Sequence, residues 1–344
     1  AARARTRGLG RRERLISALP RYAPLAARLA PLANLRNRSA ILSWIGERAL
    51  GISARRRLPA FRRDFFRDAE ADGGSAAENG KVWLLADTFN RYFEPANLRA
   101  TLRVLAAAGW RAEVARPTVD DGVRRPLCCG RTWLAAGLID QARAEARRLL
   151  RALAGDRLVL GIEPSCLLTL RDEIPALLPG PEARGLADRA LLVSEFLARE
   201  KPPLRLATRT GSALVHGHCH QKALGAFPAV LSVLRTIPGL EVRPIAASCC
   251  GMAGAFGYQV ETEATSRAIA ALGVLPAVAA AGATDIVIAD GTSCRHQIAD
   301  LAGREAIHSM RLISESLLES GSRLAITDPP GTGAGGAQRG FTAR

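Results

Sequence analysis

The sequence predicts an α/β fold of two repeated Rossmann-like parallel-sheet units, each with a cysteine motif at strand C-termini, preceded by a helical basic segment. Three observations support this prediction. Strand-like apolar runs alternate with helix-like runs, the same order of elements occurs twice, and each copy contains a Cys-Cys-Gly triplet and a later Ser-Cys pair. Alternating strands and helices form parallel sheets with helices on both faces, and sites in such sheets form just beyond the strand ends.

Each copy contains, in order, a strand, a helix, a strand, the Cys-Cys-Gly triplet, a helix, a strand and the Ser-Cys pair. The first copy predicts its strands and helices at 82–86, 96–108, 112–115, 134–152 and 158–162. The second copy predicts them at 213–216, 226–236, 241–245, 261–272 and 285–289. We therefore expect one cysteine-rich repeat at 81–205 and a second at 210–320.

Positive charge is concentrated at the N-terminal end of the chain. The net charge is +16, and residues 1–68 hold seventeen arginines against four acidic residues, a net of +13. Apolar residues at helical spacing, interrupted by prolines, predict short helices there. We expect residues 1–70 to form a basic helical segment that docks upstream modules, with an anionic membrane surface as the alternative partner. A turn-rich linker is expected near 70–80 and a flexible tail at 328–344.

Composition excludes several classes of protein. No apolar run is long enough to cross a bilayer, so we expect a cytoplasmic protein, with peripheral contact at the inner membrane face as the alternative. Nucleic acid is not an expected partner, because only 5% of residues are aromatic and they show no stacking pattern. Seven cysteines, four of them in adjacent pairs, favour metal ligation in a reducing compartment over a secreted disulfide framework. The arginine-rich start is expected to belong to a longer chain, with a transit peptide as the alternative.

The cysteines are the residues with the most specific chemistry. The second copy offers four thiols, which is the usual ligand number for one iron-sulfur cluster. The first copy offers three thiols, which are also candidate metal ligands. Gly130 and Gly251 follow the doubled cysteines, where a residue without a Cβ relieves the steric conflict of a tight turn. The candidate ligands are Cys219, Cys249, Cys250 and Cys294 for a [4Fe-4S]-type cluster, and Cys128, Cys129 and Cys166 in the first copy.

Longer motifs around the cysteines carry a family resemblance. They are Asp87-Thr88-Phe89, Tyr92-Phe93-Glu94-Pro95, Glu163-Pro164-Ser165-Cys166, His216-Gly217-His218-Cys219-His220-Gln221-Lys222, Ser248-Cys249-Cys250-Gly251-Met252-Ala253-Gly254 and Gly291-Thr292-Ser293-Cys294-Arg295-His296-Gln297. They resemble the C-terminal twin cysteine-rich (CCG) domain region of fused FAD-linked oxidases of the D-lactate and D-2-hydroxyglutarate dehydrogenase type. That region is related to heterodisulfide reductase and to the iron-sulfur subunits of glycolate, glycerol-3-phosphate and lactate oxidising enzymes.

The chain departs from the family pattern at three positions. In the family, each repeat has a leading cysteine, a Cys-Cys pair and a closing Cys-x-x-Cys. Here Glu163 and Gly291 stand at the first closing position of the two copies. The leading cysteine of the first copy is absent, and Asp87 or Thr88 stands near its place. The second copy therefore keeps a four-thiol set that the first copy lacks.

The resemblance implies an electron-transfer function. Electrons removed from a 2-hydroxy acid at an upstream flavin would pass through a ferredoxin-like module to an iron-sulfur cluster in this region, and then to an acceptor. This chain contains no Cys-x-x-Cys-x-x-Cys-x-x-x-Cys-Pro run and no glycine-rich flavin-binding segment. We therefore expect this chain to be part of an oxidoreductase, with FAD only in the missing upstream part. Its expected partners are a flavin-dependent dehydrogenase domain or subunit and a ferredoxin-like module.

Two other functions fit the cysteines. Zinc binds histidine and cysteine together, so a zinc-stabilised assembly domain of the same redox complex is the main alternative. On an extended segment His218 and His220 would share one face and Cys219 the other, so we expect Cys219 to bind the metal while the histidines orient their neighbours. A dithiol-disulfide catalyst using Cys128 and Cys129 is a third hypothesis, weakened by the strain of a disulfide between neighbouring residues.

Four polar residues near the motifs have simpler expected roles. Arg295 and His296 would place positive charge beside Cys294, or would face solvent at an ordinary helix start. Glu163 is expected to cap the helix that follows it, with an oxygen-ligand role as the alternative. His308 is expected on the surface of a helix.

Overall fold

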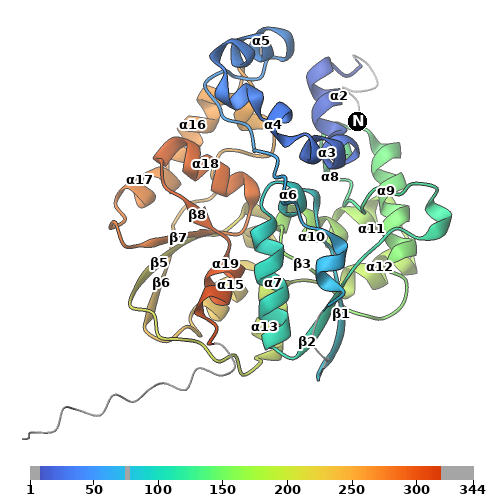
Figure 1. Cartoon of the computed structure of the whole chain (residues 1–344), viewed down its shortest axis with the longest axis vertical. Coiled ribbons are helices and arrows are strands. Elements are labelled where there is room, and N and C mark those ends of the chain that lie inside the picture. Colours follow the sequence, from blue (N-terminus) through green and yellow to red (C-terminus); the bar gives the residue numbers. More distant parts are fainter. Residues whose placement is uncertain (1–7, 74–77, 319–344) are drawn as a thin grey trace, which may run out of the picture.

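The computed structural model describes residues 8–73 and 78–318, and it contains two four-stranded sheets (Figure 1). All strand pairs are parallel, and the strand orders are β2-β1-β3-β4 and β6-β5-β7-β8. The predicted α/β class with two repeated parallel-sheet units is therefore confirmed. The tail expected at 328–344 lies outside the described residues.

The first sheet and its helices span residues 80–200. Its strands are β1 (Gly80–Leu84), β2 (Trp110–Val114), β3 (Val159–Gly161) and β4 (Ala190–Leu192). Its α-helices are α6 (Thr88–Tyr92), α7 (Pro95–Ala107), α8 (Arg131–Ala135), α9 (Ile139–Ala152), α10 (Pro164–Arg171), α11 (Glu173–Leu177), α12 (Pro181–Asp188) and α13 (Val193–Glu200). A 3₁₀ turn, η3 (Val119–Asp121), lies between β2 and α8.

The second sheet repeats this arrangement. Its strands are β5 (Gly211–His216), β6 (Leu240–Pro244), β7 (Ile286–Ala289) and β8 (Ala306–Ile307). Its α-helices are α14 (Cys219–Ala223), α15 (Phe227–Leu234), α16 (Glu263–Ala271), α17 (Val274–Ala279), α18 (Thr292–Ala302) and α19 (Ser309–Ser316), and η4 (Phe256–Tyr258) precedes α16. In both sheets the first strand is central, because the chain leaves it toward one edge and returns on its other side.

Short helices form the N-terminal segment, as its spacing predicts. They are α2 (Arg11–Ser17), α3 (Leu19–Arg28), α4 (Ala30–Ala33) and α5 (Ala40–Leu50), with 3₁₀ turns η1 (Leu35–Arg38) and η2 (Asp68–Ala71). Figure 1 shows α2–α5 together at one end of the molecule. The segment contacts both repeats, since α3 packs on α6 and Ile52 bridges to Gln259.

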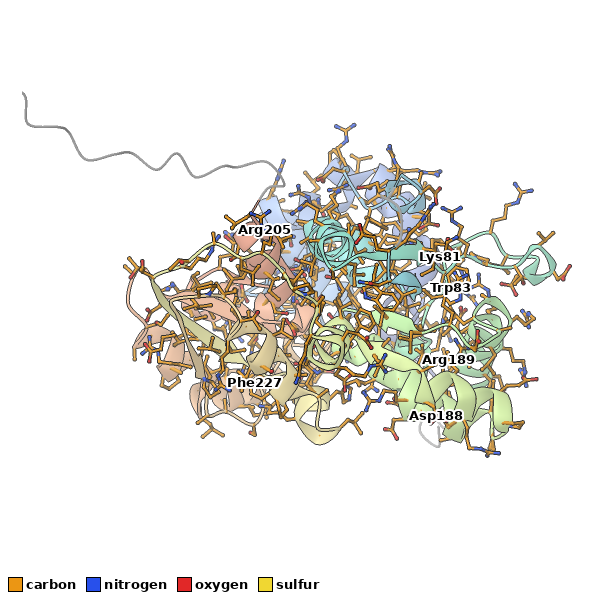
Figure 2. All side chains as sticks on the ribbon, turned by 90° about the horizontal axis from the view of Figure 1, so that it is seen from below. Lys81, Trp83, Asp188, Arg189, Arg205 and Phe227 are labelled. Carbon is orange, nitrogen blue, oxygen red and sulfur yellow. The ribbon has the colours of Figure 1, made fainter. Side chains whose placement is uncertain are left out.

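One apolar core joins the two repeats. Helix α7 packs against α19, and α13 packs against α15, so helices of the first repeat meet helices of the second. Leu84 and Phe196 share this buried cluster with Val215 and Leu312. Figure 2 shows the two units next to each other, with Lys81, Trp83 and Arg189 on the first and Phe227 on the second. Burial of apolar surface across this boundary holds the two cysteine sites in a fixed relationship.

One local prediction was wrong and one strand of each sheet was missed, both for physical reasons. The single helix expected at 134–152 is broken into α8 and α9, because Gly137 adopts a left-handed φ of 76° between them. The fourth strand of each sheet was not predicted. Strands β4 and β8 contain three and two residues, which is too short for any apolar periodicity to show.

No helix among the described residues has both the length and the apolar character that a membrane span requires.

Candidate metal centre

The cysteine motifs of the second repeat follow three adjacent strands. Strand β5 leads to Cys219, β6 leads to Cys249 and Cys250, and β7 leads to Cys294. The chain crosses from β5 to β6 on one side and returns to β7 on the other, so β5 and β7 flank the point where the strand order reverses. His216 pairs with Ala289 in the register of these strands, which brings their carboxyl ends level. Ligand sites in open α/β sheets form at this position.

The doubled cysteines are held by a glycine turn in each repeat. Gly251 has a φ of 85°, and a Cβ at this position would overlap the carbonyl oxygen of Ser266 in α16. The Gly251 N–H donates to Cys249 Sγ at 3.3 Å. In the first repeat Gly130 has a φ of 82°, and its N–H donates to Cys128 Sγ at 3.4 Å. The expected steric role of both glycines is confirmed, since L-residues rarely adopt this conformation.

The structure brings the four thiols of the second repeat into one chain of neighbours. Cys219 contacts Cys249, Cys249 contacts Cys250, and Cys250 contacts Cys294. Cys250 and Cys294 are buried, Cys249 is half-buried and Cys219 is exposed. The centre is therefore enclosed by protein on the Cys294 side and reaches the surface at Cys219.

The local electrostatics favour thiolates at two of the four cysteines. The contact with Cys250 holds the pKa of Cys294 well below its usual value despite burial, and His216 and His218 strengthen this effect. Contacts with Cys219 and Cys250 also lower the pKa of Cys249. The same contacts raise the pKa of Cys219 and of Cys250, which act as donors. Thiolates are the form of cysteine that binds metals.

One histidine of the centre was not predicted from the sequence. His216 is the last residue of β5, and one of its ring nitrogens lies within 4.8 Å of both Cys250 Sγ and Cys294 Sγ, which are themselves within that distance of each other. Both ring nitrogens are buried and have no oxygen or nitrogen partner among the described residues, and the ring interacts with the thiol of Cys294. The sequence signal that could have identified His216 was a histidine at the end of an apolar strand, directly before the His218-Cys219 motif.

The segment around Cys219 is helical, so the extended conformation expected for it is wrong. His218 is the N-cap of α14, and its Nδ1 accepts a hydrogen bond from the His220 N–H at 3.2 Å. Its own N–H donates to Gln221 Oε1 at 3.0 Å. Because the helix begins at Cys219, His218 and His220 do not share one face of a strand. His220 Nε2 instead lies 2.9 Å from Arg131 Nη2, next to the Cys-Cys-Gly turn of the first repeat.

Glu163 is the N-cap residue of α10, as expected, but its side chain bonds to a helix of the opposite repeat. The carboxylate is buried, and it makes no side-chain cap to α10. It accepts hydrogen bonds of 2.9 Å from both the backbone N–H and the hydroxyl of Thr292, the first residue of α18. Since α18 carries Cys294, a carboxylate of the first repeat fixes the helix that bears a sulfur of the second.

Arg295 is buried, His296 is half-buried, and both contact protein groups. Arg295 donates to Glu94 at 3.1 Å and to the carbonyl oxygens of Ala289 and Asp290 at 2.8 and 2.7 Å. Burial alone would raise the pKa of Glu94, but Arg295 and His296 leave it below its usual value. The charge of Arg295 is therefore largely neutralised by Glu94.

His308 is buried, so the surface position expected for it is wrong. It is the N-cap of α19, where its Nδ1 accepts from the Met310 N–H at 3.1 Å. Its Nε2 lies 3.1 Å from the carbonyl oxygen of Ile162, which follows β3 of the first repeat. The residue thus connects the two repeats.

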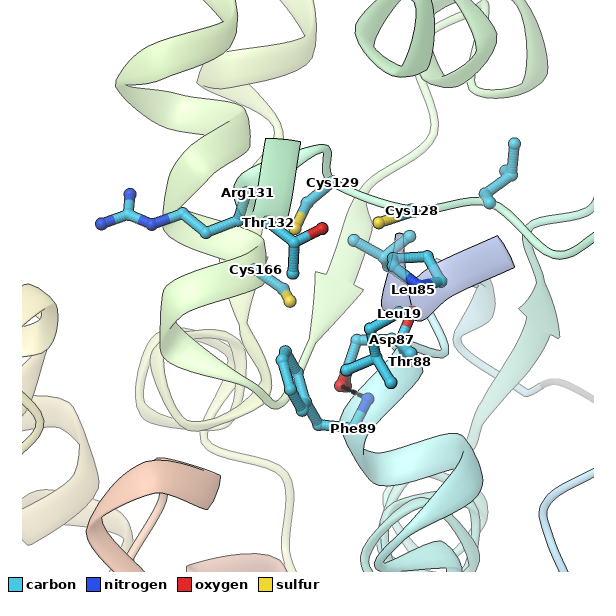
Figure 3. Close-up of a pocket in the computed structure, with 12 residues that line it drawn as sticks. Leu19, Leu85, Asp87, Thr88, Phe89, Cys128, Cys129, Arg131, Thr132 and Cys166 are labelled. Atoms are coloured by element: carbon cyan, nitrogen blue, oxygen red, sulfur yellow. Dashed lines mark hydrogen bonds between the residues drawn. The ribbon is translucent and has the colours of Figure 1, made fainter. Parts of the chain in front are cut away.

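The three thiols of the first repeat line a pocket together with Asp87, Thr88 and residues of α3 (Figure 3). Thr88 and Cys219 both occupy the first position after the N-cap of a short helix, so Thr88 stands where the leading cysteine would be. Asp87 is the N-cap itself and accepts from the N–H groups of Phe89 and Asn90 at 2.9 and 3.0 Å. Contact with Cys129 lowers the pKa of Cys166, but burial and nearby carboxylates outweigh this contact and raise the pKa to about 12.

Comparison with known proteins agrees with this arrangement. Residues 213–299 match the family described as Cysteine-rich domain (CCG). The chain is 28% identical over 300 residues to a subunit of the anaerobic glycerol-3-phosphate dehydrogenase of Escherichia coli K12, covering 84% of this chain and 72% of that protein. It is 23% identical over 320 residues to D-2-hydroxyglutarate dehydrogenase of the same strain, covering 88% of this chain and 30% of that protein. Lactate utilization protein A of Geobacillus kaustophilus is 30% identical over 142 residues, which are 39% of this chain and 59% of that protein. The relationship predicted from the motifs is confirmed.

Proposed function

Given a cysteine-rich CCG domain at residues 213–299, we propose that this chain is the iron-sulfur electron-transfer part of a flavin-linked 2-hydroxy acid oxidoreductase. Cys219, Cys249, Cys250 and Cys294 would hold a [4Fe-4S]-type cluster. The observation that carries this proposal is the continuous chain of four sulfurs at the strand-order reversal of the second sheet. Relatives named as dehydrogenases and as a lactate utilization protein support it.

The residues present fit such a group. Four thiols are the usual ligand supply of an iron-sulfur cluster, and two of them are favoured as thiolates. The surroundings also leave space around the sulfurs. A Cβ at Gly291 would overlap the ring of His218 and lie 3.3 Å from Cys294 Sγ, so the absence of a side chain there keeps room beside the sulfur.

The cluster would supply one-electron transfer, and the protein would supply its position and its access. Burial of Cys250 and Cys294 excludes water from one side, whereas the exposure of Cys219 leaves the other side open to a partner. Electron transfer needs such an approach, because an electron donor or acceptor must come close to the cluster. The donors proposed are a flavin-dependent dehydrogenase and a ferredoxin-like module, as separate subunits or as upstream parts of one chain.

We place the docking of these modules on the N-terminal helices. Eight of the fourteen large hydrophobic side chains that are exposed among the described residues lie in this segment, which is also rich in arginine. Ile41 and Leu32 are 71% and 69% exposed, and Trp44 is 55% exposed. Apolar side chains gathered on one surface mark an interaction site. These exposed apolar and basic side chains favour a protein partner whose own contact surface is apolar and acidic.

A zinc-stabilised assembly domain is the second candidate function. It is favoured by the spacing of His216, Cys250 and Cys294, whose donor atoms lie within 4.8 Å of one another. In a tetrahedral zinc site with Zn–S bonds of about 2.3 Å, donor atoms are roughly 3.8 Å apart. The same residues could therefore surround a single ion.

Metal analysis separates the two functions. The full chain should be purified without oxygen and analysed for iron, sulfide and zinc, followed by an EPR spectrum after reduction. We expect about four irons per chain, lost in Cys249→Ser, because that substitution removes a thiolate ligand. Cys166→Ser in the first repeat serves as the matched control and should leave the EPR signal of the second repeat in place. Stoichiometric zinc without iron would reject electron transfer and support the assembly domain.

A further inference from the structure

His216 is a buried imidazole that interacts with the thiol of Cys294, and neither of its ring nitrogens has an oxygen or nitrogen partner among the described residues. Its residue is 1% exposed, and it lies at the end of the central strand of the second sheet. Buried polar side chains in native proteins are almost always satisfied by a donor, an acceptor or a ligand. The Cys294 thiol can satisfy only one of the two ring nitrogens, so His216 has the capacity to bind a further group at this position.

The groups nearest to this imidazole are metal-binding sulfurs. A ring nitrogen of His216, Cys250 Sγ and Cys294 Sγ all lie within 4.8 Å of one another. Among the described residues, this is the one set of three or more His, Cys, Asp or Glu side chains with such spacing and metal-binding potential. Neutral imidazole is a common ligand for both zinc and iron.

The other histidines of the chain have different partners. His218 uses Nδ1 to cap α14, and His308 uses both nitrogens on backbone groups. His296 lies 3.3 Å from the Tyr258 hydroxyl, and His220 Nε2 lies beside Arg131. Only His216, among the described histidines, has two neighbouring sulfurs and no oxygen or nitrogen partner at either ring nitrogen.

We propose that His216 is a nitrogen ligand of the metal centre beside Cys250 and Cys294. Since a four-iron cluster takes four protein ligands, His216 would replace the exposed Cys219 in the ligand set named above, and the donor set would be three cysteines and one histidine. This inference rests on the proposed function where the metal is an iron-sulfur cluster, but His216 would serve a single zinc ion equally. It also explains a difference between the repeats. Leu85 precedes Thr88 by three residues, as His216 precedes Cys219, so the first repeat has an apolar side chain where the second has an imidazole.

A histidine ligand has a measurable electronic consequence. Imidazole is neutral, whereas thiolate carries a negative charge, so replacing one thiolate by histidine raises the reduction potential of an iron-sulfur centre. His216→Cys should therefore keep the iron and lower the reduction potential. His216→Leu, which introduces the residue of the first repeat, should remove the nitrogen donor altogether.

Pulsed EPR tests the ligand directly. The full chain, labelled with ¹⁵N-histidine and reduced without oxygen, should show strong coupling of the electron spin to a directly bound nitrogen. This coupling should vanish in His216→Leu and persist in His220→Leu, the matched control at a neighbouring histidine. Circular dichroism of each variant checks that it has folded. If His216→Leu does not fold, the sign of the potential shift in His216→Cys provides the test.

The outcomes for the ligand and for the function are distinct. Bound iron and sulfide without nitrogen coupling in the wild type would overturn the role of His216 and leave electron transfer intact. Zinc without iron would overturn electron transfer. Losing a residue that only orients a ligand weakens metal binding by up to roughly 100-fold. In the zinc case, a larger loss of zinc affinity in His216→Leu would support the role of His216 as a ligand. Equal zinc affinities in the wild type and His216→Leu would overturn it, as would the binding of neither metal.

Discussion

Glu163 in the first repeat accepts two hydrogen bonds of 2.9 Å from Thr292, at the start of the helix that carries Cys294 in the second repeat. A carboxylate at a helix N-terminus satisfies free N–H groups and interacts favourably with the helix dipole. The contact is buried, so it is not screened by solvent. The position of one sulfur of the metal centre therefore depends on a residue from the other repeat.

The first prediction concerns this contact. Glu163→Gln preserves the shape of the side chain but removes its charge and one acceptor oxygen. We expect the free energy of unfolding to fall by about 1 to 2 kcal/mol, the value of a hydrogen bond to a charged group combined with the loss of the dipole interaction. Urea unfolding of the full chain measures it, with Glu182→Gln in the exposed first turn of α12 as the control. Equal unfolding midpoints for Glu163→Gln and the wild type would contradict the capping role.

The second prediction concerns the turn after the doubled cysteines. Gly251→Ala would force a Cβ into the carbonyl oxygen of Ser266 and would strain a left-handed backbone conformation. We expect a loss of stability of at least about 2 kcal/mol and loss of metal from the second repeat, because the turn positions Cys249 and Cys250. Thermal unfolding and metal content are the measurements.

A matched glycine in an open helix provides the control for that substitution. Gly185 lies inside α12, and a Cβ there would meet no atom within 4 Å. Gly185→Ala should raise stability by up to about 1 kcal/mol, since alanine has the higher helix propensity. A Gly251→Ala protein as stable as Gly185→Ala would show that the turn can relax, and the steric argument would then be wrong.

The third prediction concerns acid sensitivity at Glu263, which joins the N-terminal segment to α16. Its buried side chain accepts hydrogen bonds from Ser53, from Arg55 at 3.0 Å and from Arg267 at 2.8 Å. Burial acts to raise the pKa of Glu263, but the hydrogen bonds from Ser53, Arg267 and Arg55 outweigh it and leave the pKa below its usual value. A depressed carboxylate pKa stabilises the fold above the pKa of the unfolded chain, about 4.3, and this contribution is lost as the pH falls through the folded value.

Glu263→Gln should therefore be less stable than the wild type at pH 7, by about 1 to 2 kcal/mol. The difference between the two proteins should shrink as the pH falls from about 5 to about 3, because the wild-type carboxylate becomes protonated. Urea unfolding at each pH measures both free energies. A difference that stays constant across this pH range would show that the charge of Glu263 is not the source of its contribution.

The sequence was sufficient to predict the repeat and the four thiols, because both depend on local patterns. Alternating apolar runs indicated the strands, and the second copy supported the first. The partners of Glu163, His308 and His216 could not be predicted, because each partner lies on an element far away in the chain. The prediction of an extended conformation around Cys219 was wrong for a local reason. His218 and Gln221 form a capping box at the start of a helix, and the cysteine motif hid this signal.

The fourth prediction concerns the exposed apolar face of the N-terminal helices. Ile41 and Trp44 lie on α5, where their side chains are 71% and 55% exposed. Because they contribute little to the core of this chain, Ile41→Ser combined with Trp44→Ser should change the free energy of unfolding by no more than about 0.5 kcal/mol. The same change should weaken association with the flavin-bearing part of the oxidoreductase at least about tenfold, since exposed aromatic and aliphatic anchors dominate protein interfaces.

Isothermal titration calorimetry with the purified flavin-bearing partner, or with the corresponding upstream part of the chain, measures that affinity. The matched control is Leu272→Ser, which removes an 85% exposed leucine at the C-cap of α16, outside the N-terminal segment in the sequence. Unchanged affinity in the Ile41 and Trp44 double variant would exclude α5 as the docking surface. Co-sedimentation of the wild type, but not of the double variant, with vesicles containing anionic lipid would assign the same face to a membrane, because arginines around an apolar surface also suit anionic headgroups.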